Sequence, residues 1–142
     1  MTVARIINDK GRDVITVSAG TSLAEIASIL SQRRIGAVVV TKDEGIQGII
    51  SERDIVRALA KHGGEALAML AADWMTAKVV TCGPEDTIND VMQTMTRGRF
   101  RHLPVVKHDK LIGIVSIGDV VKRRIEDVEQ EADQIRQYIA TA

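Results

Sequence analysis

Two stretches of the chain decide its fold: RIGAVVVTKDEGIQGIISERDIVRAL at 34–59 and RFRHLPVVKHDKLIGIVSIGDVVKRR at 99–124. They align without a gap when the 142-residue chain is shifted on itself by 65 positions. About ten of roughly 46 aligned pairs are identical, and most of the others exchange one apolar residue for another. The identical pairs include Val14/Val79, Thr16/Thr81, Val40/Val105, Gly48/Gly113, Ser51/Ser116 and Asp54/Asp119. A match that keeps its apolar register for this long indicates an internal duplication.

Each copy predicts the same order of elements: strand, helix, strand, strand, helix. Short β-branched strands are expected at 14–17 and 79–82,. The helix after each strand repeats apolar residues at three- and four-residue spacing. Its N-cap is expected at Thr21 or Ser22 in the first copy and at Asp86 or Thr87 in the second,. The fold class is therefore α/β (α+β): two β-α-β-β-α repeats, related by a pseudo-twofold axis and packed sheet to sheet, with an extended C-terminal helix.

We divide the chain into four parts. Residues 1–64 form the first repeat with an N-terminal lead, 65–75 a helical linker, 76–125 the second repeat, and 126–142 a C-terminal helical extension. The Gly63-Gly64 pair marks the break before the linker, whose helix we expect Trp74 to anchor,. A copy of about 60 residues buries its core poorly alone, whereas two copies packed sheet to sheet bury it well, and 45% hydrophobic residues are enough for a sizeable core,.

Composition excludes several classes of function. Lys plus Arg and Asp plus Glu number 19 each, and this neutral balance argues against a general nucleic-acid-binding protein,. Aromatic residues make up only 2%, too few for a base-stacking platform,. The sequence shows no signal peptide and no apolar run of membrane-spanning length, so we expect no membrane partner,. The single cysteine, Cys82, is expected in the core and suits a reducing cytoplasm, and the scattered histidines predict no metal site,.

The motif G-x-x-S-x-x-D occurs once in each copy, with Ser51 and Asp54 in the first and Ser116 and Asp119 in the second. Two interpretations fit this motif. The Ser-x-x-Asp spacing caps a helix N-terminus. The same helix N-terminus offers free N–H groups to a phosphate, and the carboxylate can accept hydrogen bonds from the two neighbouring hydroxyls of a ribose. The second interpretation predicts a ribonucleotide ligand and does not require that the cap be lost.

The doubled set of motifs resembles a pair of cystathionine-β-synthase (CBS) domains, a tandem called a Bateman module. The resemblance is carried by GIISERD at 48–54, GIVSIGD at 113–119 and RHLPVV at 101–106, together with the strand openings VITV and VVTC, and it covers nearly the whole chain. It implies a regulatory module that binds an adenosine-containing ligand (AMP, ADP, ATP, NAD(H) or S-adenosylmethionine) in clefts between its repeats. It also implies a homodimer.

The resemblance implies two ligand sites, and residue differences make them non-equivalent. Arg53 adds charge where the second copy has Gly118,. The first site is expected to contain Ser51, Arg53 and Asp54 with Thr76, Lys78, Val80 and Phe100. The second is expected to contain Ser116, Gly118 and Asp119 with Lys10, Asp13, Ile15, Gly36 and Ala37. Arg101 and His102 are either solvated or, as the resemblance implies for cationic residues before L-P-V, in contact with phosphate.

The C-terminal extension carries a separate signal. Its apolar residues recur at spacings of four and three, the a/d pattern of a coiled coil: Val121, Ile125, Val128, Ala132, Ile135 and Ile139,. Two interpretations remain open, since the helix can pack on its own domain or pair with another copy across a dimer. The acidic stretch DVEQEADQ at 127–134 argues against a membrane-surface helix,.

These observations favour a non-catalytic, cytoplasmic sensor of AMP, ATP or NAD(H). It would act through rearrangement of a homodimer or through a regulated protein that the sequence does not name. The sequence contains no P-loop, no dinucleotide-binding glycine motif and no recognisable nucleophile–base pair, so we expect neither an enzyme nor a catalytic cofactor,. The alternative is a ligand-free scaffold or dimerisation module, and the intact Ser/Asp pairs argue against it.

Overall fold

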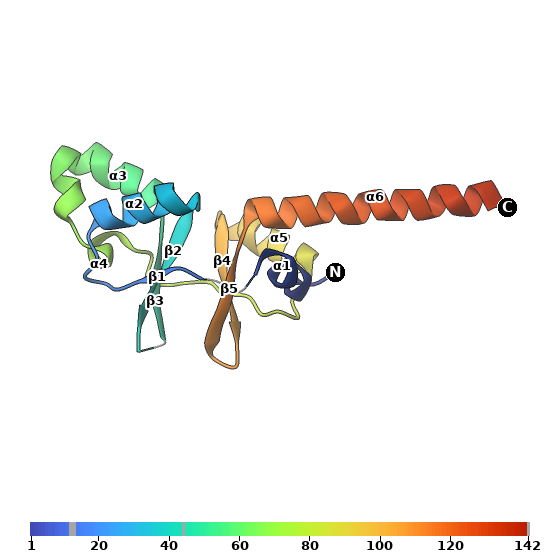
Figure 1. Cartoon of the computed structure of the whole chain (residues 1–142), viewed down its shortest axis with the longest axis horizontal. Coiled ribbons are helices and arrows are strands. Elements are labelled where there is room, and N and C mark those ends of the chain that lie inside the picture. The colour runs from blue at the N-terminus through green and yellow to red at the C-terminus, as the bar shows by residue number, and fades with distance from the viewer. Residues whose placement is uncertain (12–13, 44, 142) are drawn as a thin grey trace.

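The computed structural model of the chain describes residues 1–11, 14–43 and 45–141. It is a mixed α/β structure with a three-stranded sheet of order β1-β2-β3 and a two-stranded sheet, β4-β5. The hairpins β2-β3 and β4-β5 lie side by side near the middle of the molecule, and α6 extends far beyond the body (Figure 1). The predicted repeats and the long C-terminal helix are therefore confirmed. None of the described helices is both long and apolar enough to cross a membrane.

The first repeat consists of β1 (Thr16–Val17), α2 (Leu23–Arg33), β2 (Ala37–Lys42), β3 (Gly45–Ser51) and α3 (Glu52–His62). Strand β1 runs parallel to β2, and β2 runs antiparallel to β3. Of the two predicted caps for α2, the structure uses Ser22, whose hydroxyl accepts a hydrogen bond from the Glu25 N–H at 3.2 Å. The buried side chains of α2 and the two long strands form one core, which includes Leu23, Ile26, Leu30, Val38, Val40 and Ile50.

The second repeat contains α5 (Ile88–Gly98), β4 (His102–Lys107), β5 (Lys110–Ser116) and α6 (Ile117–Thr141). Strands β4 and β5 are antiparallel, in the register that pairs Val105 with Gly113. The cap of α5 is Thr87, whose hydroxyl accepts a hydrogen bond from the Asp90 N–H at 3.0 Å. Thr87 and Ser22 occupy equivalent positions, so the two copies begin their first helix in the same way.

The strand expected at 79–82 is the main difference between the copies. These residues, all of which the structure describes, form only an isolated parallel bridge between Cys82 and Val105. In the first copy the Val39 N–H donates to the Ile15 carbonyl at 3.5 Å. The residue equivalent to Val39 is Pro104, which has no N–H to donate,. The prediction of a full strand was therefore wrong, because a proline in the neighbouring strand removes a ladder hydrogen bond.

The linker also differs from the continuous helix expected over 65–75. It forms a 3₁₀ helix, η1 (Gly63–Ala68), and a short helix, α4 (Ala71–Trp74), separated by extended backbone at Met69 and Leu70. This extended part bonds to the start of α2: the Leu23 N–H donates to the Met69 carbonyl, and the Ala71 N–H donates to the Thr21 carbonyl, both at 2.8 Å. Trp74 anchors the linker as expected, since it packs against the first core.

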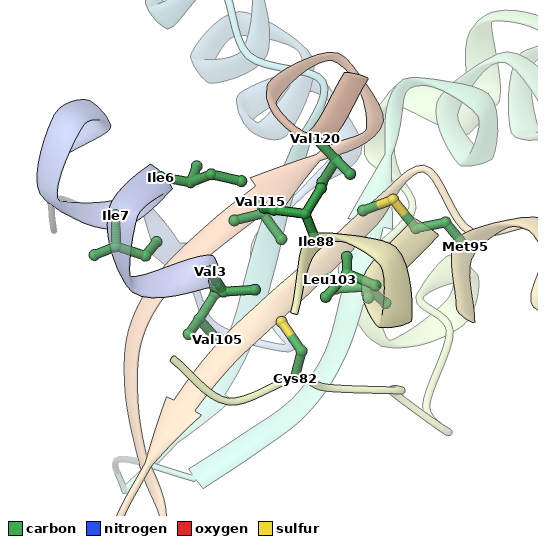
Figure 2. Packing of buried hydrophobic residues seen from close by; sticks show 11 residues of the cluster. Val3, Ile6, Ile7, Cys82, Ile88, Met95, Leu103, Val105, Val115 and Val120 are labelled. Atoms are coloured by element: carbon green, nitrogen blue, oxygen red, sulfur yellow. The ribbon is translucent and has the colours of Figure 1, made fainter. Parts of the chain in front are cut away.

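The N-terminal lead forms α1 (Val3–Lys10), which packs on the second repeat although it precedes the first. Figure 2 shows Val3, Ile6 and Ile7 among the core residues of β4, β5 and α5. A Cβ on Gly113 would lie 2.5 Å from Ile7 Cδ1, so only glycine lets α1 approach β5 this closely,.

The linker makes the equivalent contact on the first repeat. A Cβ on Gly48, the counterpart of Gly113, would lie 2.6 Å from Met75 Sδ. The segment before each repeat therefore packs on the sheet of the other repeat. This exchange brings Lys10 to the Ser116/Asp119 turn, and it brings Thr76, Lys78 and Val80 to the cavity of the Ser51/Asp54 turn.

Candidate functional site

A cavity of about 650 Å³ lies between the two repeats. All seven residues predicted for the first site line it: Ser51, Arg53, Asp54, Thr76, Lys78, Val80 and Phe100. Thr76 is fixed against β3, because its N–H and carbonyl both bond to the Ile49 backbone, at 2.9 and 3.1 Å. The cavity is thus closed on one side by the first repeat and on the other by the segment that leads into the second.

Asp54 is the buried acid of this cavity, with 4% of its surface exposed. One carboxylate oxygen accepts hydrogen bonds from the Ser51 N–H at 2.8 Å and from the Ser51 hydroxyl at 3.2 Å. The other oxygen pairs with Arg57, whose side chain is largely exposed. The turn therefore stabilises the start of α3, as the capping interpretation predicts, and it keeps a carboxylate at the cavity wall.

The other charges of the cavity are mostly positive. Its further lining residues are Gly36, Ile49, Glu52, Val56, Arg57, Val79, Gly98, Arg99, Arg101 and His102. Arginine and lysine side chains come from both repeats and face the N-terminus of α3, where the helix dipole adds partial positive charge. This combination of cations, a helix N-terminus and one buried carboxylate suits an anionic ligand that also carries hydroxyl groups.

The second Ser/Asp turn has the same local geometry but a different partner. The Asp119 carboxylate accepts from the Ser116 N–H at 2.9 Å, and the Asp119 N–H donates to the Ser116 hydroxyl at 3.1 Å. The Lys10 ammonium lies 2.7 Å from the same carboxylate oxygen and also donates to the Ile114 carbonyl at 3.1 Å. Burial raises the pKa of Asp119, but Lys10 and the Ser116 N–H outweigh it, so the pKa lies below its ordinary value.

The space beside Asp119 is smaller, about 240 Å³, and is lined by Ile6, Asp9, Lys10, Asp119, Lys122, Arg123 and Glu126. Of the residues predicted for this site, the structure brings Lys10 to Asp119 but does not bring Ile15, Gly36 or Ala37 to this space. Ile15 packs against the first core, and Ala37 is buried at the start of β2. Gly118 lies exposed in the first turn of α6, and Asp13 lies outside the described residues.

Gly36 lies at the first cavity because it precedes β2 and the Glu52 N–H donates to its carbonyl at 3.0 Å. A Cβ on Gly36 would lie 2.9 Å from His102 Nε2, so His102 is packed directly against this backbone. Burial lowers the pKa of His102, and Lys10 lowers it further, against the opposing charges of Asp119 and Glu52. The lowered pKa disfavours the cationic form of His102.

Comparison with known proteins identifies the architecture. A family model described as the CBS domain matches the chain twice, over residues 4–61 and 71–126. The chain belongs to the CBS-domain family. A crystal structure of a CBS-domain containing protein from Agrobacterium tumefaciens is 46% identical, with a TM-score of 0.83 over 87% of this chain and 92% of that one. The mitochondrial CBS domain-containing protein CBSX3 of Arabidopsis thaliana is 31% identical over 97% of this chain and 71% of its own length.

A third similar CBS pair was solved with ligands. The CBS domain pair of protein MJ0100, in complex with 5′-methylthioadenosine and S-adenosyl-L-methionine, is 26% identical, with a TM-score of 0.77 over 86% of this chain and 98% of that chain. Both of those ligands contain adenosine. The family therefore includes a CBS pair that binds adenosine-derived molecules.

Several lining residues of the CBS cavity were missed from the sequence, among them the two arginines Arg57 and Arg99. Arg57 follows Asp54 by three positions in a helix, a spacing that brings side chains together and could have predicted the ion pair,. Arg99 was not among the residues expected at either site. It ends α5 in the left-handed conformation, with φ 57°, and lines the cavity beside Phe100. A left-handed arginine gives no clear sequence signal, because glycine and asparagine are the residues usual at that position.

Proposed function

We propose that this CBS pair is a non-catalytic sensor that binds an adenosine nucleotide, AMP, ATP or NAD(H), in the cavity between its repeats. The observation that carries the proposal is the position of the buried Asp54 carboxylate, at a helix N-terminus and in a cavity that arginine and lysine side chains of both repeats also line. A ligand there touches both repeats at once. It can therefore favour one relative arrangement of the repeats over another, which is the requirement for signalling.

Each part of a nucleotide has a matching group in this cavity. The phosphate would lie at the N-terminus of α3, near Arg53 and the cations of the second repeat,. The ribose hydroxyls would donate to Asp54 in place of Arg57, whose side chain is 68% exposed and free to turn away. The adenine would lie against Val80 and Phe100. The adenosine-derived ligands of the MJ0100 pair support this choice of ligand class.

The two sites would differ in affinity. In the first, every hydrogen bond that the described part of the chain makes to the Asp54 side chain comes from its own turn and helix. In the second, Lys10 from α1 already occupies the Asp119 carboxylate. A ribose at Asp119 would have to displace this ammonium, so the first cavity is the principal site of the proposal.

The output of the sensor would be a change in a homodimer or in the affinity for a separate regulated protein. The proposal keeps the cytoplasm as its compartment, because a chain with one cysteine forms no intramolecular disulfide and suits a reducing environment,. Cys82 is buried, and burial and nearby Asp86 raise its pKa to about 12. Such a thiol is unreactive.

The test is a binding panel on the purified protein with AMP, ATP, NAD, NADH, S-adenosylmethionine and dAMP. A ligand at 100 times its Kd should stabilise the fold by about 2.7 kcal/mol, which a thermal shift of several degrees reports. AMP should bind at least tenfold more tightly than dAMP, and Asp54→Asn should remove that difference. Asp90→Asn, an exposed acid at the same position of α5, is the matched control.

Two results would contradict the proposal. If no adenosine ligand shifts the melting temperature of protein freed of bound nucleotide, the scaffold alternative is favoured. If the bound nucleotide is hydrolysed and mass spectrometry finds its products, the protein is not a passive sensor.

A further inference from the structure

Helix α6 carries its apolar seam on an exposed face. The seam residues Val121, Ile125, Val128, Ile135 and Ile139 expose 41, 53, 46, 59 and 68% of their surface, although all are aliphatic. The outer half of the helix projects from the body along the long axis of the molecule (Figure 1). A projecting helix of this length is only marginally stable in water by itself, so its apolar side requires a partner.

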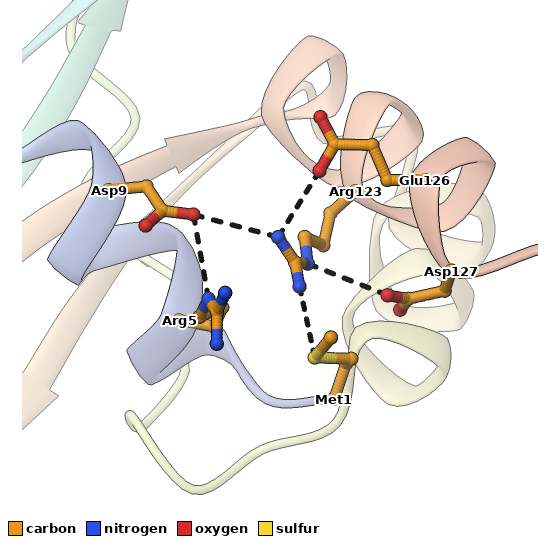
Figure 3. A network of polar contacts seen from close by, with 6 residues as sticks. All are labelled: Met1, Arg5, Asp9, Arg123, Glu126 and Asp127. Atoms are coloured by element: carbon orange, nitrogen blue, oxygen red, sulfur yellow. Dashed lines mark hydrogen bonds and ion pairs between the residues drawn. The ribbon is translucent and has the colours of Figure 1, made fainter. Parts of the chain in front are cut away.

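The anchored side of α6 prevents the seam from turning inward. Val120 is fully buried in the second core, and Arg123 is 8% exposed. Figure 3 shows the Arg123 guanidinium between α1 and α6, where it pairs with Asp9 at 3.6 Å, Glu126 at 3.2 Å and Asp127 at 3.6 Å. These contacts fix the rotation of the helix. Of the two interpretations left open by the sequence, packing of the seam on its own domain is therefore wrong.

The charges beside the seam indicate what covers it. With Ile125, Ala132 and Ile139 at position a, the flanking g and e positions hold Arg124 and Glu129, and one heptad later Glu131 and Arg136. In a parallel pair in register, each g residue faces the e residue five positions later in the other helix. Arg124 then faces the partner's Glu129, and Glu131 faces the partner's Arg136. All of these pairs are of opposite charge.

An antiparallel pair gives the opposite result. Full overlap of the seam would set Val121 against the partner's Ile139, with the centre of the contact at residue 130. Glu129 and Glu131 would then each approach their own copies, and Lys122 would approach the partner's Arg136. Like charges at these positions oppose association.

We propose that α6 binds α6 of a second copy as a parallel, in-register, two-stranded coiled coil. Because α6 lies along the long axis of the molecule, the twofold axis of this pair runs in the same direction (Figure 1). The first repeats of the two subunits therefore lie at the same end of the dimer axis, and so do the two second repeats. This inference rests on α6 alone and is independent of the ligand.

Disulfide trapping on the full chain tests the orientation. In the parallel pair Ile135 faces the partner's Ile135, so Ile135→Cys should give a covalent dimer under mild oxidation. Gln137→Cys, two residues away on the outer face, is the matched control and should stay unlinked. Cys82 does not interfere, because it is buried.

Three outcomes would overturn the proposal. The first is linkage only when Ile125→Cys and Ile135→Cys chains are mixed, which indicates an antiparallel pair. The second is no linkage in any of these samples. The third is a mass of three chains in light scattering.

A charge exchange provides an independent measurement on uncrosslinked protein. Arg124→Glu should raise the dimer Kd roughly fivefold, because it sets like charges against each other in both g–e pairs that it makes. Adding Glu129→Arg should restore the Kd, whereas adding Glu131→Arg should not. Restoration by Glu131→Arg instead would contradict the parallel register. Circular dichroism on each variant confirms that α6 is still folded.

Discussion

Lys10 and Asp119 form the contact that separates the second site from the first. Their side chains are 39 and 27% exposed, so solvent screens the pair and its stabilisation is less than about 1 kcal/mol,. The pair nevertheless joins α1 to the first turn of α6. The pair decides whether the Asp119 carboxylate is available to a ligand. Its effect on ligand binding is therefore larger than its effect on the stability of the protein.

The ion pair between Lys10 and Asp119 should affect how far the stability of the protein falls at acid pH. The folded-state pKa of Asp119 is lowered, so its contribution is present above the unfolded pKa of about 4 and is lost as pH falls through the folded value,. Between about pH 5 and pH 2, the free energy of unfolding should therefore fall less in Lys10→Met than in the wild type. Thermal melts across this range measure the effect, with Lys61→Met as the control. Identical pH profiles for wild type and Lys10→Met would show that the pair is not formed in solution.

Gly36 allows the close contact between the repeats at His102. Gly36→Ala would place a methyl group 2.9 Å from His102 Nε2, and the overpacking should destabilise the protein by about 1–3 kcal/mol,. Gly20→Ala, which meets nothing within 4 Å, is the control. Urea titration of both variants measures the difference. The double variant Gly36→Ala/His102→Ala should recover most of the loss, and failure to recover would place the strain elsewhere.

At the scale of elements, local rules predicted what local contacts determine. The caps at Ser22 and Thr87, the paired hairpins and the seam of α6 follow from spacing within a few residues. The full strand predicted at 79–82 is reduced to one bridge, because its pairing depends on Pro104, a residue in another strand. The alignment of Val39 with Pro104 contained that signal, since a proline cannot donate to the neighbouring strand.

For the candidate site, too, the local contacts were predictable and the long-range contacts were not. The Ser/Asp turns are sequence-local, and the position of Lys78 and Phe100 opposite Ser51 came from the family resemblance. The resemblance placed Lys10 in one site with Asp119, and the structure brings the two together. That they form an ion pair, and that His102 packs on Gly36, was not predicted, because both contacts depend on which sheet each leading segment packs against. Nothing in the spacing of α1 distinguishes the two sheets.

At the scale of the whole molecule, the exchanged leading segments bind the two repeats into one cooperative unit. Ile7 in α1 is 2% exposed in the second core, whereas Trp74, the only tryptophan, packs against the first. Ile7→Ala should destabilise the protein by about 2–5 kcal/mol. Because neither repeat is complete without the other, the denaturant midpoint reported by Trp74 fluorescence should fall together with the midpoint reported by far-ultraviolet circular dichroism.

The matched control for Ile7→Ala is Val56→Ala, since Val56 is 63% exposed. Val56→Ala should leave the denaturant midpoint of unfolding nearly unchanged. A Trp74 transition that stays at the wild-type denaturant concentration, while the dichroism midpoint falls, would show that the repeats unfold separately.

The exchange also has a consequence for synthesis on the ribosome. Helix α1 emerges before either repeat, but the surface that buries Val3, Ile6 and Ile7 includes Val115 and Val120, which are made more than 100 residues later. At about 5–20 residues per second, these three apolar side chains wait on the order of ten seconds for their partners. During that interval the growing chain depends on the nascent-chain chaperones of the cell, and a slower ribosome lengthens its exposure.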